Sequence, residues 1–574
     1  LTPAVIYQRN LVKLLFNNFC KIKSKTFLLN HPLLHSSLPS NDKFMPSIGN
    51  GHIATNIFSD TVYMNGLYNG QAGYSHRARI PAWANIRLNS TLTHAPYSPV
   101  YSLDTKEGVF KVRVDRERSV VTQRIYAHRF YTRAIVNQIQ IWYPRMVKLH
   151  ASIVLQEDGE ELYKKHVEEW QKLYQQGSVD IEGNLELVSV KGIWYYFLSS
   201  LPSQESFQPL DRYYGLSPTG LARGGTFEDY EGHNFWDTET WMFPSILLLY
   251  PQYANKLLQY RLDTAYVAAE LAKYTGNKGY RFPWESAYTG VEVTQPCCPD
   301  VAIFEQHISG CISFAIRQYL ATTRDEEWYF LTFQSIFFSI SDVMGPDEDH
   351  RNVNNSIFTN VVSYYMAKDP EHWADIAWSL TLPYDEEFDY HPQFSGYERG
   401  DKIKQADAVL LGFPLQSTRL NDLMYYESMT RENGPAMTWS MHTIGHLQVD
   451  DASKADSIFN MSYEGFVREP FKVWSELRRP DSGAVNFFTG MGGFLQTLIF
   501  GYAGVSIHLD RLEINKPRLP PNATKFTIRG RLQDFFLGRR NITGNKFYIQ
   551  GWLRFTRDFV VKVSFLNNNV KVYC

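Results

Sequence analysis

Cysteine is scarce in this sequence, with only five among 574 residues. They are Cys20, Cys297, Cys298, Cys311 and Cys574, and they form neither a C-x-x-C pair nor a cluster with histidine. Structural zinc sites and disulfide frameworks both require patterned cysteines. The sequence therefore indicates no disulfide framework and predicts that the protein uses no metal and no cofactor.

Long apolar runs and blocks of one charge are also lacking. No apolar stretch reaches the roughly 18 residues that span a bilayer, and LLLYPQYANKLL is interrupted by Pro251. The 57 basic and 59 acidic side chains give a formal net charge of -2, which argues against a nucleic acid or an anionic membrane as partner. We expect a soluble protein with a small or uncharged ligand and favour the cytoplasm over the secretory and lysosomal compartments. The pattern does not indicate an oligomeric state.

Aromatic residues, in contrast, are abundant. The chain has 36 Tyr, 37 Phe and 13 Trp, which together make up 15% of it. Aromatic rings pack well against the apolar faces of ligands, although a large core also collects them. The length of the chain is typical of about two to four domains.

Hydrophobic patterning separates two regions in the first third of the chain. Residues 50–155 show short period-two runs, such as VFKVRVD and AIVNQIQIWY, which predict antiparallel strands of a sandwich. Residues 160–177 place apolar residues three and four apart, as a surface helix does. We therefore assign an N-terminal β-sandwich domain to residues 1–155 and a helical linker to residues 156–186.

The pattern changes twice more. Residues 187–503 contain about ten helix-length segments, separated by loops and without intervening strand runs, which favours a toroid of paired helices. Residues 504–574 return to alternation in GVSIHLDRLEINKP, KFTIRGRL, KFYIQGWLRF and FVVKVSF, and predict a small C-terminal β-domain. The predicted fold class is multidomain α+β.

Two loops in the helical region place carboxylates beside tryptophan. In FWDTETW, Asp237 follows Trp236, and in FPWESAY, Glu285 follows Trp284. A sugar site needs such a pair, because the acid accepts hydrogen bonds from hydroxyls while the ring covers a C–H face. The alternative is that Asp237 caps the N-terminus of a core helix.

A third loop, VMGPDEDHRNVNNSIFTN, has Asp347, Glu348, Asp349 and His350 in succession. Four adjacent side chains point in different directions, so they do not converge on a metal as the ligands of a D-x-D-x-D-G loop do. Two interpretations remain. The loop is either a solvated turn, or one of its carboxyls lies in a partly dry cleft, has a raised pKa and donates a proton.

Two further segments contribute polar side chains. KIKQADAVLL contains Lys404 and Gln405, which either hydrogen-bond a ligand or begin a helix as exposed side chains. EPFKVWSELRR places Glu476 after Trp474 and before a Gly-rich turn. A carboxylate at this point of a toroid could face Glu348 across the centre.

Together these segments resemble glycoside hydrolase family 65. GHNFWDTETWMFP, PWESAYTGVE, EQHISG, GPDEDHRNVNNSIFTN and KQADAVLL occur in the order and at about the spacing of that family, between residues 40 and 570. YNGQAGYSHRARIP, HPQFSGYERG, GPAMTWSMHTIG and EPFKVWSE resemble its animal branch. The family implies an N-terminal β-sandwich, a linker, a central (α/α)6 barrel and a small C-terminal β-sandwich.

The resemblance also implies roles for the residues in these segments. Glu348 matches the general acid that protonates the glycosidic oxygen, and Glu476 matches the carboxylate expected to act as general base. The residues expected to bind substrate are Trp236, Asp237, Lys404, Gln405, Trp284 and Glu285. An inverting reaction would place the acid and base carboxyls about 6.5–9.5 Å apart, with a water between base and sugar.

The activity implied by the resemblance is inverting hydrolysis of α-linked glucose from glucosyl-galactosyl-hydroxylysine units of collagen-type glycopeptides. The alternative within the family is a disaccharide phosphorylase or a trehalase-like hydrolase. Glu476 favours hydrolysis, because an anion at that position would repel phosphate. The chain is shorter than the family pattern near residues 155 and 342, so a catalytically impaired carbohydrate-binding variant is a third interpretation.

Overall fold

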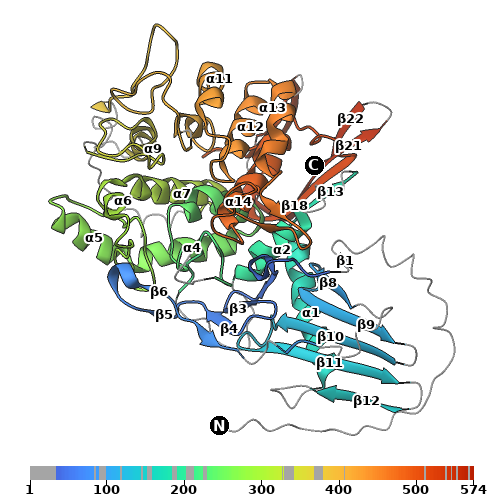
Figure 1. The fold of residues 1–574 in the computed structure, drawn as a ribbon. Coiled ribbons are helices and arrows are strands. Elements are labelled where there is room, and N and C mark those ends of the chain that lie inside the picture. The colour runs from blue at the N-terminus through green and yellow to red at the C-terminus, as the bar shows by residue number, and fades with distance from the viewer. Residues whose placement is uncertain are drawn as a thin grey trace.

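The computed structural model describes most of the chain from residue 34 onward. The described residues are 34–35, 37–82, 86–88, 99–116, 119–143, 146–151, 158–183, 190–201, 213–223, 229–325, 328, 342–367, 379–405, 407–509, 512–536, 539–543, 546–550, 554–566 and 569–573. Within the described part of the chain, strands form both ends and helices form most of the middle (Figure 1). The chain is therefore a mixed helix and strand protein, as its patterning predicts.

Two antiparallel sheets and a short ribbon form the N-terminal region. The larger sheet has the strand order β1-β8-β9-β10-β11-β12, and the smaller has the order β2-β3-β4-β7. The strands of the larger sheet are β1 (Leu34–His35), β8 (Val100–Asp104), β9 (Val109–Arg116), β10 (Ser119–Ala127), β11 (Ile135–Tyr143) and β12 (Met146–Ala151). Those of the smaller sheet and the ribbon are β2 (Ser47–Gly49), β3 (Ile53–Asn56), β4 (Thr61–Met64), β7 (Ile80–Pro81), β5 (Tyr68–Asn69) and β6 (His76–Arg77). The antiparallel pairing predicted from alternation is confirmed.

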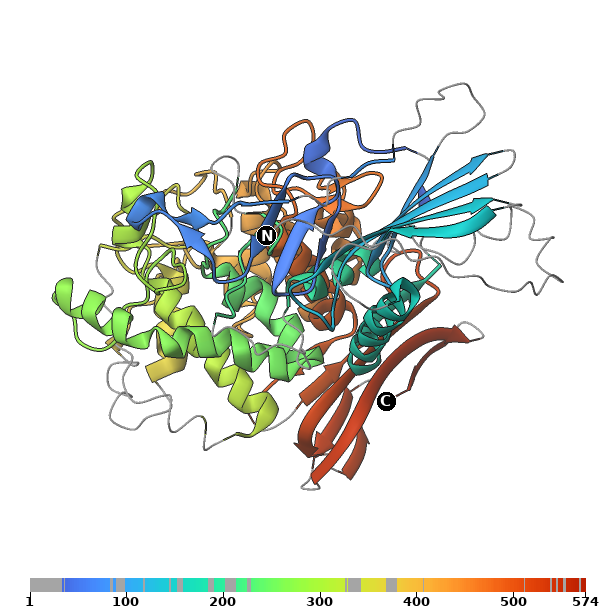
Figure 2. The same ribbon diagram turned by 90° about the horizontal axis from the view of Figure 1, so that it is seen from below.

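Helix α1 (Gly159–Gln176) lies between the N-terminal and C-terminal sheets (Figure 2). Asp158 caps its first turn by accepting a hydrogen bond from the N–H of Glu160 at 2.8 Å. The apolar stripe of the helix is buried, and Trp170 packs so closely on Gly108 that a Cβ there would lie 2.0 Å from the indole nitrogen. The helix predicted at residues 160–177 is confirmed.

The helical region follows. Its helices are α2 (Val190–Ser200), α3 (Phe243–Leu249), α4 (Pro251–Asp263), α5 (Ala265–Tyr274), α6 (Pro299–Phe304), α7 (His307–Thr323), α9 (Ile357–Ala367), α11 (Leu420–Met429), α12 (Thr438–Gln448), α13 (Ala452–Phe459) and α14 (Phe488–Gln496). Most of the predicted helical segments DEEWYFLTFQSIFFSIS and PEHWADIAWSLTL lies outside the described residues. Among the described helices, none is both long enough and apolar enough to cross a membrane.

Two expectations for this region are wrong. YRLDTAYVAAELAKYTG, expected to form one helix, is divided between α4 and α5 at Thr264. The Thr264 hydroxyl donates to the carbonyl of Tyr260 at 2.9 Å, a bond to the preceding turn that bends helices. The region also contains strands, because β14 (Val467–Arg468) and β15 (Val473–Trp474) form a short hairpin.

Two four-stranded sheets form the C-terminal region, in the orders β13-β18-β21-β22 and β16-β17-β20-β19. Their strands are β13 (Ser178–Glu182), β16 (Val505–Ile507), β17 (Leu512–Asn515), β18 (Lys525–Phe536), β19 (Arg539–Thr543), β20 (Lys546–Gln550), β21 (Arg554–Leu566) and β22 (Asn569–Tyr573). KFYIQGWLRF, expected to form one strand, contributes to β20 and β21 in different sheets. β13 comes from within the residues assigned to the linker, and it pairs with β18 so that Ser178 lies opposite Arg529.

Helix α14 lies in the interior of the helical region, and every residue of it is buried. Its glycines allow close approach of a neighbouring backbone. A Cβ on Gly492 would lie 2.3 Å from the carbonyl oxygen of Trp241, in the π-helical segment η4 (Thr238–Met242). This contact packs the middle of α14 against η4, and a hydrogen bond from Thr489 to Asp237, the residue that precedes η4, joins the start of α14 to the same segment.

A buried ion pair holds η4 against α4. Arg261 donates to both carboxylate oxygens of Glu239, at 2.8 and 3.1 Å, and to the carbonyl of Phe235 at 2.9 Å. Both charged side chains are only 2% exposed. Glu239 therefore has a structural partner, and the pair fixes the backbone on either side of Asp237.

Replacing Arg261 with Leu would leave the carboxylate of Glu239 buried without its partner. We expect Arg261→Leu to lower the free energy of unfolding by about 3–5 kcal/mol. Denaturant unfolding followed by tryptophan fluorescence measures this change. The matched control is Lys164→Ala, which removes one side of the exposed pair with Glu168 and should cost less than about 1 kcal/mol. Equal losses in the two variants would contradict the assignment.

Candidate active site

Glu348 lies in a loop that is pinned at both of its ends. Val343 pairs with Val353 across the loop, and Met344 forms a bridge with Glu305. The Glu348 carboxylate accepts a hydrogen bond from Nζ of Lys404 at 2.7 Å, and each of these side chains is 31% exposed. The loop therefore presents one partly open carboxylate, already paired with a cation.

Asp347, the residue before Glu348, is buried. Its carboxylate accepts hydrogen bonds from Nε2 of Gln393 at 3.1 Å, from Nδ1 of His350 at 3.2 Å and from the backbone N–H of Lys404 at 3.3 Å. The hydrogen bond to Asp347 raises the pKa of His350. Asp347 thus fixes the backbone below Glu348, and the acidic cluster is not merely a solvated turn.

Lys404 and Gln405 contact the loop of Glu348, residues 343–353, which is called the acid loop below. They belong to a segment beside this loop. Ile403 pairs with Thr430, which fixes the backbone of the segment, and the side-chain amide of Gln405 donates to the carbonyl of Pro346. Burial lowers the pKa of Lys404, but the charges of Glu348 and then of Glu476 outweigh it and leave the pKa raised. The negative charges of both predicted catalytic carboxylates therefore act on the ammonium group of Lys404.

Glu476 follows β15, and hydrogen bonds orient both of its carboxylate oxygens. The phenol of Tyr230 donates to Oε1 at 2.8 Å, and the backbone N–H of Ala484 donates to Oε2 at 3.0 Å. Gly483 has a φ of 53°, and a Cβ there would lie 2.7 Å from Oε2. The turn therefore needs glycine at this position to hold the carboxylate.

Asp237 lies between these groups and the start of α14. It accepts a hydrogen bond from the hydroxyl of Thr489 at 2.6 Å. Burial, which is the largest cause, and the charges of Glu348 and Glu476 together raise the pKa of Asp237 to about 7, against the lowering effect of the Thr489 hydrogen bond. The structure thus gathers Asp237, Glu348, Lys404 and Glu476 from four separate segments, although η4 does begin directly after Asp237.

Trp236 and Trp284 belong to one aromatic cluster beneath these groups. Trp236 is only 3% exposed, and its ring meets His307 edge-on at 4.8 Å between centroids. Trp284 meets Phe235 at 5.8 Å and His307 at 6.1 Å, both edge-on. Their predicted contact with sugar stays a prediction, whereas their packing role is visible in these contacts.

Glu285 is buried in a chain of polar groups that leads to the N-terminal region. Its Oε1 lies 2.6 Å from Nδ1 of His233, whose Nε2 lies 3.1 Å from the hydroxyl of Ser75. Burial raises the pKa of Glu285 to about 8 and lowers the pKa of His233 to about 3. At neutral pH the pair is therefore a neutral hydrogen-bonded unit that anchors the FPWESAY loop to the N-terminal region.

Several residues of the site escape sequence reasoning. Three of them donate a hydrogen bond to a carboxylate of the site, namely Tyr230, Thr489 and Gln393. They lie far from that carboxylate in the sequence, so no motif spacing links the two. Arg77 of β6 donates to the carbonyls of four residues in the loop before Asp237, namely Gly220, Leu221, Arg223 and Gly232. The segment YNGQAGYSHRARIP contains this arginine, but nothing in its pattern indicates what it would contact.

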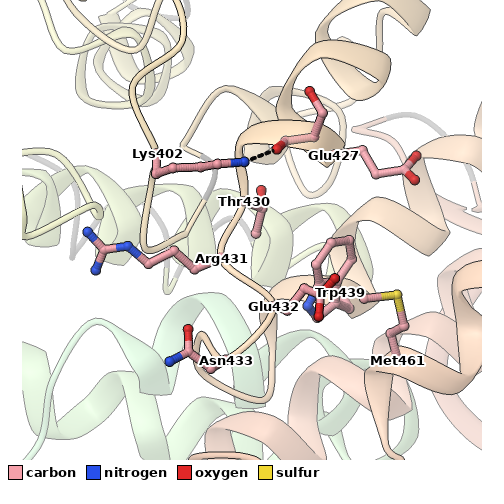
Figure 3. Close-up of a pocket in the computed structure, with 9 residues that line it drawn as sticks. Lys402, Glu427, Thr430, Arg431, Glu432, Asn433, Trp439 and Met461 are labelled. Atoms are coloured by element: carbon pink, nitrogen blue, oxygen red, sulfur yellow. Dashed lines mark hydrogen bonds between the residues drawn. The ribbon is translucent and has the colours of Figure 1, made fainter.

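A cavity of about 480 Å³ lies next to the segment that contains Lys404 (Figure 3). The lining residues are Lys402, Glu427, Ser428, Thr430, Arg431, Glu432, Asn433, Trp439 and Met461. Figure 3 shows Arg431 and Lys402 on one side and the ring of Trp439 on the other. Arg431 also pairs with Asp349 of the acid loop at 2.6 Å. The cavity thus adjoins the site through a charged contact.

Comparison with other proteins identifies the family of this constellation. Residues 216–334 match the central catalytic domain of glycosyl hydrolase family 65. The chain is 32% identical to the protein-glucosylgalactosylhydroxylysine glucosidase of Gallus gallus, over 86% of this chain and 87% of that protein. The chain belongs to glycosyl hydrolase family 65. The resemblance noted in the sequence is confirmed, and as a member of family 65 the chain is a glycosidase-type enzyme.

Other members of family 65 support the assignment. The glucosidase of the same name from Dictyostelium discoideum is 32% identical over 92% of this chain and 90% of its own length. A kojibiose hydrolase of Flavobacterium johnsoniae is 31% identical over 64% of this chain and 57% of its own length. A human-microbiome structure described as a kojibiose phosphorylase matches 94% of this chain and 95% of its own, with a TM-score of 0.65 at 15% identity. This last likeness shows that the fold is shared.

The match to the Gallus gallus protein extends over 619 positions, more than the 574 residues of this chain. That relative therefore contains segments without a counterpart here, and the prediction that this chain is shortened near residues 155 and 342 stays a prediction. Residues 152–157 and 329–341 lie outside the described part of the chain. The described residues on the other side, from Asp342 onward, form the pinned acid loop.

The raised pKa of Asp237 predicts a pH-dependent loss of stability. The folded state holds the proton up to about pH 7, whereas an unfolded Asp releases it near pH 4, so stability falls as the pH rises between these values. We expect Asp237→Asn to remove this loss, so that the stability difference between wild type and variant changes by up to about 4 kcal/mol from pH 4 to pH 8. Melting temperatures across this range measure it. A difference that is constant with pH would contradict the assignment.

Proposed function

We propose that this family 65 enzyme is an inverting hydrolase that releases α-linked glucose from glucosyl-galactosyl-hydroxylysine units of collagen-type glycopeptides. The substrate assignment is supported by the relatives of that name, which match 86% and 92% of the chain. The reaction is supported above all by one observation. Nζ of Lys404 lies 2.7 Å from the carboxylate of Glu348, and the charge of Glu476 also raises the pKa of Lys404, so one cation lies near both the proposed acid and the proposed base.

In the proposed mechanism Glu348 is the general acid and Glu476 the general base. Glu348 gives its proton to the glycosidic oxygen as the bond from that oxygen to the glucose C1 breaks. Glu476 takes a proton from a water whose oxygen forms the new bond to C1 from the opposite face. The products are β-glucose and the free aglycone hydroxyl, and the protons on the two carboxyls are exchanged through solvent.

The hydrogen bonds of the two carboxylates suit these roles. Tyr230 and the N–H of Ala484 donate to the two carboxylate oxygens of Glu476, which fixes the orientation of the carboxylate toward the attacking water. Lys404 pairs with Glu348 at 2.7 Å, which holds the carboxyl of the acid beside a side chain that can also bind a sugar hydroxyl. A sugar hydroxyl that accepts a hydrogen bond from Lys404 would leave the carboxyl of Glu348 available to the glycosidic oxygen. Lys404 and Gln405 would then hold the glucose, together with Asp237.

The main alternative is a phosphorylase or a trehalase-like hydrolase acting on a free disaccharide. A phosphorylase shares the fold, as the human-microbiome structure indicates. Phosphate supplies its own nucleophilic oxygen and would be repelled by a carboxylate at the base position. Because Glu476 is held by two donors to its carboxylate, hydrolysis is the better supported of the two reactions.

We also propose how the helices and strands are arranged into domains. We assign the helices of residues 187–503 to an (α/α)6 barrel, with β-sandwiches at residues 1–155 and 504–574. The burial of α14 supports a closed arrangement of helices around it. Cys297 and Cys298 are exposed free thiols, as is common in a reducing compartment, and this supports the cytoplasm as the site of action.

Amide variants of the two carboxylates should separate their roles. We expect Glu348→Gln to lower turnover of the glycopeptide roughly 10²–10⁴-fold, because the leaving oxygen is no longer protonated. Its turnover of α-glucosyl fluoride should change little, because fluoride leaves without a proton. Glu476→Gln should lose activity on both substrates, since both need an activated water. Rates with the two substrates measure this, and equal losses for Glu348→Gln would exclude it as the acid.

The nucleophile is identified by the product. We expect purified protein to release free glucose from glucosyl-galactosyl-hydroxylysine at the same rate with and without inorganic phosphate, and the first-formed glucose to be the β-anomer. Proton NMR during the first minutes of reaction measures both. Formation of glucose 1-phosphate would show a phosphorylase instead. Sugar binding without any turnover would show the impaired variant.

A further inference from the structure

A small cavity lies behind Gln405, on the side away from the acid loop. Its volume is about 10 Å³, and roughly 10–15 Å³ is what one water molecule needs. The lining residues are Trp241, Gln405, Val409, Leu410, Thr438, Met441 and His442. They come from η4, from the segment after Lys404 and from α12, so the cavity lies where three parts of the site meet.

Four of these side chains have a polar atom without a partner among the described residues. The atoms are Nε1 of Trp241, Oε1 of Gln405, Oγ1 of Thr438 and Nδ1 of His442. All four residues are more than nine-tenths buried. Buried polar atoms are almost always hydrogen-bonded in folded proteins, so four of them around one cavity indicate a polar ligand.

The hydrogen bonds of the neighbouring groups determine which of these atoms donate. The hydroxyl of Thr430 donates its proton to the carbonyl of Tyr426 at 2.6 Å. Its oxygen can therefore only accept a hydrogen bond from Nε2 of His442, at 3.2 Å. The proton of His442 is therefore on Nε2, and Nδ1 is an acceptor. The amide nitrogen of Gln405 donates to the carbonyl of Pro346, which leaves Oε1 as the acceptor that lines the cavity.

The four atoms therefore form two donors and two acceptors. Trp241 Nε1 can only donate, and the Thr438 hydroxyl is free to donate, while Gln405 Oε1 and His442 Nδ1 accept. A water molecule offers two protons and two lone pairs, which match this set completely. An ion of either sign would leave half of the set unsatisfied, and the volume excludes a larger molecule.

We infer that this cavity is a binding site for one internal water, which ties α12 and η4 to Gln405 and thereby to the loop of the catalytic acid. The water holds Oε1 of Gln405, so the amide nitrogen stays on the carbonyl of Pro346, two residues before Glu348. Gln405 is thus a positioning residue for the acid as well as a predicted sugar contact. The catalytic consequence rests on the proposed role of Glu348, whereas the water site does not.

A crystal structure of the wild-type protein, at a resolution that shows ordered waters, tests the site itself. We expect one density peak in the cavity, about 2.7–3.2 Å from the four atoms. An empty cavity, or direct hydrogen bonds among the four side chains, would overturn the inference. Neither outcome depends on whether the protein hydrolyses the proposed substrate.

Thr438→Val tests the catalytic consequence, because it removes one donor without changing the size of the side chain. We expect turnover of the glycopeptide to fall several-fold with little change in KM, and turnover of α-glucosyl fluoride, which needs no acid, to stay within about twofold. The matched control is Thr443→Val on the same helix, whose hydroxyl donates to the carbonyl of Trp439 and not into the cavity. Equal losses in both variants, or on both substrates, would show a structural effect only.

Discussion

The ion pair between Lys404 and Glu348 is the interaction on which the rest of the site depends. It joins segments 56 residues apart and places one cation among the charges of Glu348 and Glu476. Without that cation the carboxylates would repel one another in a partly buried space. Asp347 supports the pair from below, since it accepts hydrogen bonds from the backbone of Lys404 and from Gln393. The loops are therefore fixed by charge as much as by packing.

The N-terminal strands are part of the scaffold of this site. Arg77 holds four carbonyls of the segment that leads to Asp237, and Ser75 reaches His233, which pairs with Glu285. A guanidinium suits this task because it offers five N–H donors in a fixed plane. The catalytic loops of the helical region are thus held from outside it, by residues of the ribbon β5-β6.

Sequence patterning identified the candidate catalytic and sugar-binding residues, but it did not identify the residues that hydrogen-bond to them. Glu348, Asp237 and Glu476 stand in polar loops with unusual local composition, so the pattern and the family resemblance both reveal them. Tyr230 and Thr489 meet their carboxylates across 246 and 252 residues, and no periodicity records such a contact. The same applies to the helix break at Thr264, which depends on one hydroxyl, and to β13, whose partner lies at the other end of the chain.

The place of strand β13 in the sequence determines when its sheet can form during synthesis. Its contact with β18 joins Glu182 to Lys525, 343 residues later, so the helical region lies between two strands of a single sheet. As the chain leaves the ribosome, β13 has no partner until almost all of the protein has been made. An unpaired strand edge is a place where other chains can pair. The sheet that joins the two ends of the helical region therefore stays incomplete until the last strands of the chain have been made.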